Sequence, residues 1–159
     1  DTTVNVDPDA TTLAHIATTV GRFVERLELV PRIAMLSFSN FGSARMEQSQ
    51  KVAEAVQLVK DSAPNLMIDG EMQFNVAFNK AYRKSLYDFS SLEGNANVFI
   101  FPNLEAGNIA YKMMQTIGEA ELIGPVLLGL NKPVHVLERE SEVNDIVNLT
   151  ALTGFRVDE

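Results

Sequence analysis

Hydrophobic positions along this chain follow two different periods. Short, almost continuous apolar runs are typical of buried strands. Residues 1–6 are also predicted to form a short strand or the remnant of one. Between these runs, apolar residues recur every three or four positions, which is typical of helices that bury one face. The predicted strands cover 32–38, 66–68, 97–101 and 126–128, and the predicted helices cover 7–29, a stretch through Val52–Val59 that ends at Ala63-Pro64, 71–78, 103–117 and a last helix from 143. This alternation predicts an α/β layered fold. Residues 80–95 break both periods and are predicted to form a long cover loop.

Composition narrows the classes of function. The 159 residues are enough for one domain with a real core, and they are 46% hydrophobic and 21% charged, as in an ordinary globular protein. The formal net charge is −8 and no basic cluster stands out, so neither nucleic acid nor a membrane is expected as a partner. There is no cysteine, which excludes disulfides and thiolate chemistry. We expect a cytoplasmic protein and, because the sequence begins at Asp1 without a methionine, a fragment of a longer chain.

The stretch Asn97–Lys112 carries the main candidate site. It reads as a strand, a turn at Pro102 and a helix capped by Asn103, and its apolar helix positions fall on one face. Gly107, Asn108 and Lys112 lie off that face. Ligands of open α/β sheets bind at the carboxyl ends of strands, so these residues are candidates for binding. An ordinary strand–helix unit with a solvated polar face is the alternative.

A second candidate is the polar turn after the strand at 32–38. Ser39 and Asn40 begin the segment Ser39–Ser43, and backbone N–H groups before a helix suit an anion. Turns of α/β proteins also use Ser, Asn and Gly for purely conformational reasons.

Several stretches together resemble the phosphate acetyl/butyryltransferase family, in joint order and over nearly the whole chain. They are RIAMLSFSNFGS (32–43), DGEMQ (69–73), NVFIFPNLEAGNIAYK (97–112), IGPVLLGL (123–130), KPV (132–134) and DIVN (145–148). The resemblance implies an α/β three-layer sandwich with a mostly parallel sheet, like one half of the two-domain unit of isocitrate and isopropylmalate dehydrogenases. Residues 1–130 would form the second domain of that unit. Residues 131–159 would return to a first domain that this chain lacks.

The loop before the last helix departs from the family's catalytic pattern. Transferases carry a serine, an arginine and an aspartate there, and these positions fall on Glu138, Arg139 and Asp145. The serine is therefore lost, and Glu140 stands where the family has glycine. Because phosphate and CoA are anions, the carboxylates of this loop work against acetyl transfer. The pattern FSNFGS (38–43) is closer to the phosphotransacetylase-like domain of NADP-dependent malic enzymes.

The leading hypothesis is therefore a catalytically inactive regulatory domain of an NADP-dependent malic enzyme, with acetyl-CoA as effector. The parent would decarboxylate malate to pyruvate with NADP and a divalent metal in another part of its chain. The resemblance implies cofactor-binding roles for Gly107, Asn108, Lys112, Arg139 and Asp145, and for Ser39 and Asn40, and it implies no metal site in this chain. Expected partners are a second copy of the chain and the parent's N-terminal domains. The alternatives are the C-terminal half of an active phosphate acetyltransferase and a purely structural oligomerisation module.

Overall fold

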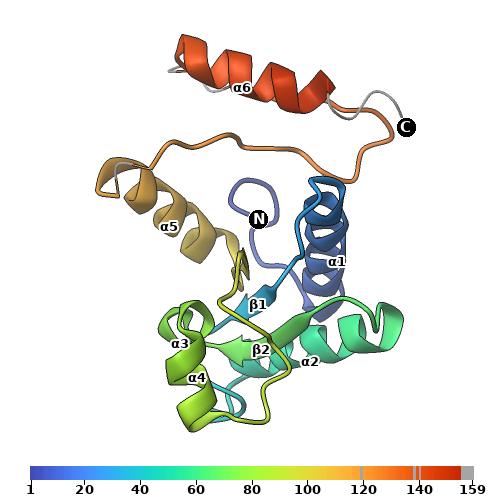
Figure 1. Ribbon diagram of the computed structural model, residues 1–159, viewed down its shortest axis with the longest axis vertical. Helices are drawn as coiled ribbons and strands as arrows, with labels where there is room; N and C mark the ends of the chain where they lie inside the picture. The colour runs from blue at the N-terminus through green and yellow to red at the C-terminus, as the bar shows by residue number, and fades with distance from the viewer. Residues whose placement is uncertain (119, 138, 140, 155–159) are drawn as a thin grey trace. The chain divides into compact units, whose positions relative to one another are not determined.

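The computed structural model describes residues 1–118, 120–137, 139 and 141–154. It divides into two compact units, residues 1–107 and residues 108–159, which are described separately. The first unit holds the sheet and the helices that cover it (Figure 1). The fold is α/β, as the sequence predicts.

Three parallel strands form the sheet of the first unit. They are β1 (Ile33–Leu36), β2 (Ile68–Met72) and β3 (Val98–Ile100), in the order β2-β1-β3. All four residues of β1 are buried, which explains why this strand reads as a continuous apolar run rather than an alternating one. The pairing of β1 with β2 is regular from Ile33 to Met35 and then shifts, because Leu36 pairs with Met72 and skips Glu71.

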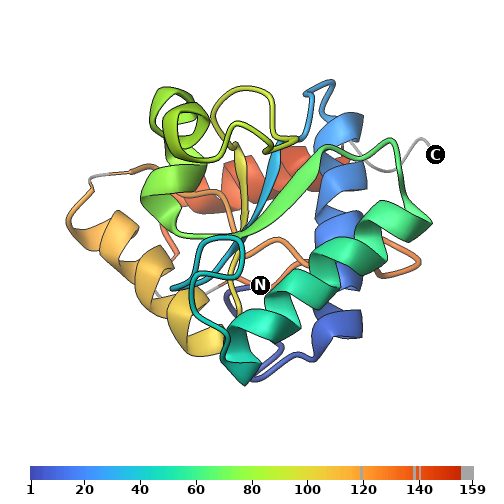
Figure 2. The same ribbon diagram turned by 90° about the horizontal axis from the view of Figure 1, so that it is seen from below.

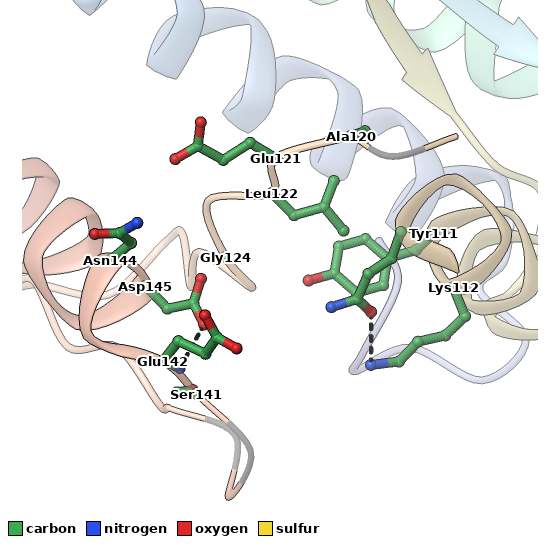
Figure 3. A pocket seen from close by; sticks show the side chains of 11 residues that line it. Tyr111, Lys112, Ala120, Glu121, Leu122, Gly124, Ser141, Glu142, Asn144 and Asp145 are labelled. Atoms are coloured by element: carbon green, nitrogen blue, oxygen red, sulfur yellow. Dashed lines mark hydrogen bonds between the residues drawn. The ribbon is translucent and has the colours of Figure 1, made fainter. Parts of the chain in front are cut away.

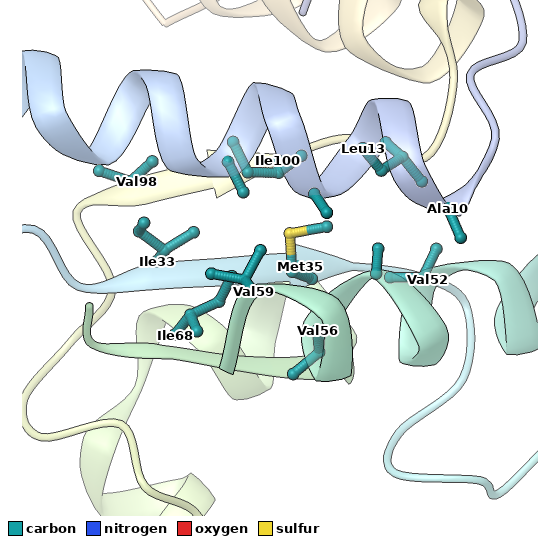
Figure 4. Packing of buried hydrophobic residues seen from close by; sticks show 13 residues of the cluster. Ala10, Leu13, Ile33, Met35, Val52, Val56, Val59, Ile68, Val98 and Ile100 are labelled. Atoms are coloured by element: carbon teal, nitrogen blue, oxygen red, sulfur yellow. The ribbon is translucent and has the colours of Figure 1, made fainter. Parts of the chain in front are cut away.

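Helices cover both faces of this sheet, which gives the predicted three layers. Helices α1 (Ala10–Arg26) and α2 (Glu47–Ser62) pack side by side on one face (Figure 2). Their apolar side chains meet Ile33 and Met35 of β1 in one buried cluster (Figure 4). The opposite face of β1, formed by Ala34 and Leu36, packs against α3 (Phe74–Phe78) and the segment 92–96.

The N-terminal segment differs from its prediction. Residues 1–6 form no strand, because the Asp1 carboxylate accepts hydrogen bonds from the N–H groups of Thr3, Val4 and Asn5 and folds the segment into a turn. Helix α1 begins later than expected, since Asp9 rather than Asp7 caps it by accepting from the Thr12 N–H at 2.7 Å. Hydrogen bonding from Thr12 holds the pKa of Asp9 below its usual value.

Two further predictions within the first unit are wrong in their bounds or type. Strand β2 begins at Ile68 instead of 66 and runs through the predicted helix start at 71, because residues 68–72 pair with β1. Residues 80–95 are not one long loop, because α4 (Lys80–Leu86) lies within them. Asn79 caps α4, and Arg83 is fully buried on the inner face of this helix. Hydrophobic periodicity does not predict such a helix, because its buried residue is charged.

The second unit contains α6 (Val143–Gly154) and most of α5 (Leu104–Thr116), which starts within residues 1–107. Asn103 caps α5 as predicted, because its side chain accepts from the Ala106 N–H. The predicted burial of one apolar face here is wrong: Ile109, Met113 and Met114 of α5 are more than half exposed, and so is Ile117 just after the helix. The predicted strand at 126–128 is also absent, and the Leu127 N–H donates to His135 Nδ1 instead of to a ladder. The expected division at 130/131 stays a prediction.

Candidate functional site

A polar pocket in the second unit brings two of the predicted site residues together. It has a volume of about 440 Å³, and Lys112 from α5 and Asp145 from α6 both line it. Figure 3 shows Tyr111 and Lys112 on one side and Glu142 and Asp145 on the other. The remaining lining residues are Gln115, Ala120, Glu121, Leu122, Gly124, Ser141 and Asn144.

The start of α6 holds Asp145 in place. The Glu142 carbonyl accepts the first helical hydrogen bond, from the Ile146 N–H, so Glu142 occupies the cap position. Asp145 lies three residues later, and its carboxylate accepts from the Glu142 N–H at 2.8 Å. A carboxylate at this position satisfies a helix N–H that has no partner within the helix. In this structure, Asp145 therefore shapes the loop that precedes α6.

Lys112 supplies the positive charge of this pocket. Its ammonium lies 3.5 Å from the Gln115 side-chain oxygen and 5.3 Å from the centre of the Tyr111 ring. Three carboxylates line the same pocket, those of Glu121, Glu142 and Asp145. Among the lining residues that the structure describes, acidic groups thus outnumber Lys112 three to one. Across the described ranges, no group of three or more acidic or histidine side chains is arranged to hold a metal ion.

The other candidates of this region are placed differently. Arg139 is exposed and does not line the pocket, while Glu138 and Glu140 lie outside the described residues. Asn108 is exposed on α5. Gly107 is buried, and a Cβ at this position would meet the Asp1 carbonyl oxygen at 2.5 Å. The absence of a side chain at Gly107 therefore permits this close backbone approach, and contact of these residues with an acyl-CoA stays a prediction.

Ser39 and Asn40 lie in the first unit, at the carboxyl end of β1. Ser39 is fully buried, and its hydroxyl donates to the Glu71 carboxylate at 2.8 Å. The Asn40 side-chain oxygen accepts from the Gln73 N–H at 2.8 Å. Both side chains thus bind residues 71–73, and their proposed role toward a ligand stays a prediction. Glu71 belongs to the family segment DGEMQ, but the sequence does not mark it as a site residue, because a glutamate at a predicted helix start carries no signal of burial.

A second pocket lies at the carboxyl ends of β1 and β3. The chain passes from β1 to β2 on one side and then crosses to β3 on the other, so the loops diverge between β1 and β3. Ligands of open α/β sheets favour such switch points. This pocket has a volume of about 470 Å³, and its lining residues are Val6, Asp7, Ser37, Phe38, Gln48, Lys51, Pro102, Asn103 and Glu105. Lys51 binds Asp7 at 2.7 Å. The sequence does not predict a site role for Gln48 or Lys51, because only the tertiary fold brings α2 to this edge of the sheet.

The chain is similar to two kinds of known protein, phosphate acetyltransferases and NADP-dependent malic enzymes. The family profile described as "Phosphate acetyl/butaryl transferase" matches residues 1–154. Phosphate acetyltransferase of Bacillus subtilis is 44% identical over 154 residues, which is 97% of this chain and 48% of that protein. NADP-dependent malic enzyme of Escherichia coli is 45% identical over 153 residues, which is 96% of this chain and 20% of that protein.

A solved structure agrees with these matches. The EutD phosphotransacetylase from Staphylococcus aureus superposes with a TM-score of 0.91 at 40% identity, covering 97% of this chain and 48% of that one. The chain therefore spans about half the length of the phosphotransacetylases from Bacillus subtilis and Staphylococcus aureus, and a smaller share of the malic enzyme. In the described residues, no helix is both long and apolar enough to cross a membrane. Sequence and fold together show that this chain belongs to the phosphate acetyl/butyryltransferase family.

Proposed function

We propose that this chain is a regulatory domain that binds acetyl-CoA without transferring its acetyl group, within an NADP-dependent malic enzyme. The observation that carries this proposal is the pocket whose described lining residues include one ammonium, that of Lys112, and three carboxylates. The parent would oxidatively decarboxylate malate with NADP and a divalent metal held outside this chain. The chain alone would then be no enzyme. We further propose a cytoplasmic homodimer that contacts the parent's malic enzyme part.

Charge favours binding without catalysis. Acetyl transfer between CoA and phosphate must bring two anions together, and the attacking or leaving oxyanion needs positive groups around it. A carboxylate about 5 Å from a phosphate charge costs roughly 3 kcal/mol at an effective dielectric constant near 20. Glu142 and Asp145 line the pocket opposite Lys112 (Figure 3). An effector that places one phosphate at Lys112 experiences this repulsion from the carboxylates once. A transferase must also bind a second anion, the phosphate substrate, and that anion would be repelled as well.

The residue types at the family's catalytic positions support the same reading. Glu138 stands at the serine position, and a carboxylate has no hydroxyl that donates to a departing thiolate. Asp145 is kept, but its carboxylate accepts from the Glu142 N–H. The arginine position is kept as Arg139. A chain with one of three catalytic side chains replaced resembles a binding domain more than a transferase.

An active phosphate acetyltransferase is the second candidate, because the Bacillus subtilis enzyme is as similar as the malic enzyme is. Two assays of the full-length protein that contains this chain separate the candidates. We expect malate-dependent reduction of NADP and no formation of acetyl phosphate from acetyl-CoA and phosphate. Acetyl transfer at a rate typical of enzymes, with no reduction of NADP, would establish the second candidate instead.

Replacing Lys112 by alanine is expected to weaken acetyl-CoA binding about 10- to 100-fold. A hydrogen bond to a charged group contributes about 1.5–3 kcal/mol, and Lys112 brings an ammonium to the pocket lining. Calorimetric titration of acetyl-CoA into the full-length protein and its Lys112→Ala variant measures the change. Lys80→Ala, which removes an exposed lysine of α4, is the matched control and should leave the affinity unchanged. Equal affinities of all three proteins would place the effector elsewhere.

A further inference from the structure

Glu71 is a buried acid that the proposed function does not use. Its side chain is 3% exposed, and among the described residues no lysine, arginine or histidine forms an ion pair with it. It stands where the register of β1 with β2 shifts, since Met35 pairs with Gly70 and Leu36 with Met72. An extra residue in one strand re-aims its own side chain. The Glu71 side chain reaches the turn that follows β1, where it meets hydrogen-bond donors instead of a cation.

The turn Ser39–Ser43 supplies these donors. The Ser39 hydroxyl lies 2.8 Å and the Gly42 N–H nitrogen 2.7 Å from the same Glu71 carboxylate oxygen. The preceding N–H, that of Phe41, donates to the Glu71 backbone carbonyl at 2.8 Å. Phe41 and Gly42 both have positive φ, 48° and 85°, and turns with unusual backbone angles can present N–H groups to an anion. Here the Gly42 N–H points at the carboxylate, while the Phe41 N–H binds the Glu71 backbone.

Further hydrogen bonds keep this turn in shape without help from Glu71. The Asn40 N–H and the Ser39 hydroxyl both lie within hydrogen-bond distance of the Ser43 hydroxyl, and the Ala44 N–H donates to Ser39 Oγ. Gln73 adds two bonds, from its N–H to Asn40 and from its side chain to the Phe38 carbonyl. The donors are therefore held in position by contacts other than the one with the Glu71 carboxylate.

We propose that Ser39–Ser43 is an anion-binding cradle that the chain occupies permanently with its own Glu71 carboxylate. The cradle is closed to the phosphates of a ligand as long as Glu71 is in place. Its two donors to one oxygen fit a small carboxylate. Removing the Glu71 side chain beyond Cβ leaves a space of the size and shape of acetate, and acetate is then expected to bind.

The test is complementation by acetate in the full-length protein. Calorimetric titration should detect saturable acetate binding to the Glu71→Ala variant and none to the unaltered protein. Adding Ser39→Ala to that variant removes one of the two donors and should weaken acetate binding about tenfold. Titration of acetyl-CoA runs in parallel, so that loss of the effector site is recognised separately from the behaviour of the cradle. A folded Glu71→Ala variant that binds no acetate would overturn the proposal.

The variant Glu71→Gln covers the case in which Glu71→Ala does not fold. Glutamine keeps the shape of the side chain but offers a neutral oxygen, so the Gly42 N–H should exchange with solvent at least tenfold faster. The Ser37 N–H, which donates to the Met72 carbonyl at 2.9 Å, is the internal reference and should not change. Unaltered exchange at Gly42 would show that its N–H does not distinguish a carboxylate from a neutral oxygen, which would overturn the assignment of an anion-binding cradle.

Discussion

Replacing Gly70 by alanine is expected to lower the free energy of unfolding by at least about 3 kcal/mol. Gly70 lies in β2 with φ at 144°, a conformation that residues with a Cβ rarely adopt. A Cβ there would also lie 2.6 Å from the Met35 carbonyl oxygen and 3.0 Å from the Met35 Cβ. Because Met35 is in the central strand and fully buried, its backbone has no room to yield. Urea unfolding followed by circular dichroism measures the loss.

Gly42→Ala separates the two causes of that loss. Gly42 also has a positive φ, 85°, but no atom lies within 4 Å of the position that its Cβ would take. This variant suffers only the conformational penalty, about 1–2 kcal/mol. A loss at Gly70 no larger than that at Gly42 would show that the strands separate to admit the methyl group, contrary to the close pairing of Met35 with Gly70.

Replacing Arg83 by methionine is expected to lower the free energy of unfolding by about 3–5 kcal/mol. The Arg83 side chain is fully buried and donates to four backbone carbonyls, those of Val76, Ala77, Leu92 and Gly94. It thereby joins α3, α4 and the segment that precedes β3. Methionine fills much of the space but leaves these four buried acceptors without a donor, and each such loss is costly. Burial also lowers the pKa of Arg83, an effect that Asp69 opposes.

Two further variants of α4 show whether the loss at Arg83 comes from its hydrogen bonds or from its charge. Arg83→Lys keeps the charge but loses the planar fork that reaches four carbonyls at once, so most of the loss should remain. Lys84→Met removes an exposed charge one residue away and should change stability by no more than about 0.5 kcal/mol. If Arg83→Lys were as stable as the unaltered protein, positive charge rather than hydrogen-bond geometry would hold this region together.

The pocket lining illustrates how far a single sequence leads toward a site. Lys112 and Asp145 were singled out from local pattern and family resemblance, and they share one pocket. Glu121 and Gln115 were not, because neither belongs to a motif, and they reach the pocket only through the fold of residues 108–159. Arg139 belongs to the motif but lies outside the pocket lining. Sequence motifs therefore identify residues with suitable chemistry, whereas only the structure shows which of them lie close together.

The sequence by itself determined the α/β class, the central strand and the helices with one strongly apolar face. These features follow from local periodicity, because the burial of a strand or a helix face dictates which positions are apolar. Helix α2 and the capped start of α5 are examples, since both begin or end where turn residues and caps predict. The family pattern was likewise readable, because residue order carries it directly.

Tertiary structure alone decided which polar groups are buried and which apolar groups are not. Glu71 and Arg83 look like solvent-facing residues in sequence, yet partners far along the chain satisfy their hydrogen bonds in the interior. Conversely, Ile109 and Met113 look like core positions but are exposed, and the apolar run Val126-Leu127-Leu128 finds no strand to pair with. The physical reason is the same in each case: burial depends on long-range partners, and local periodicity contains no information about them.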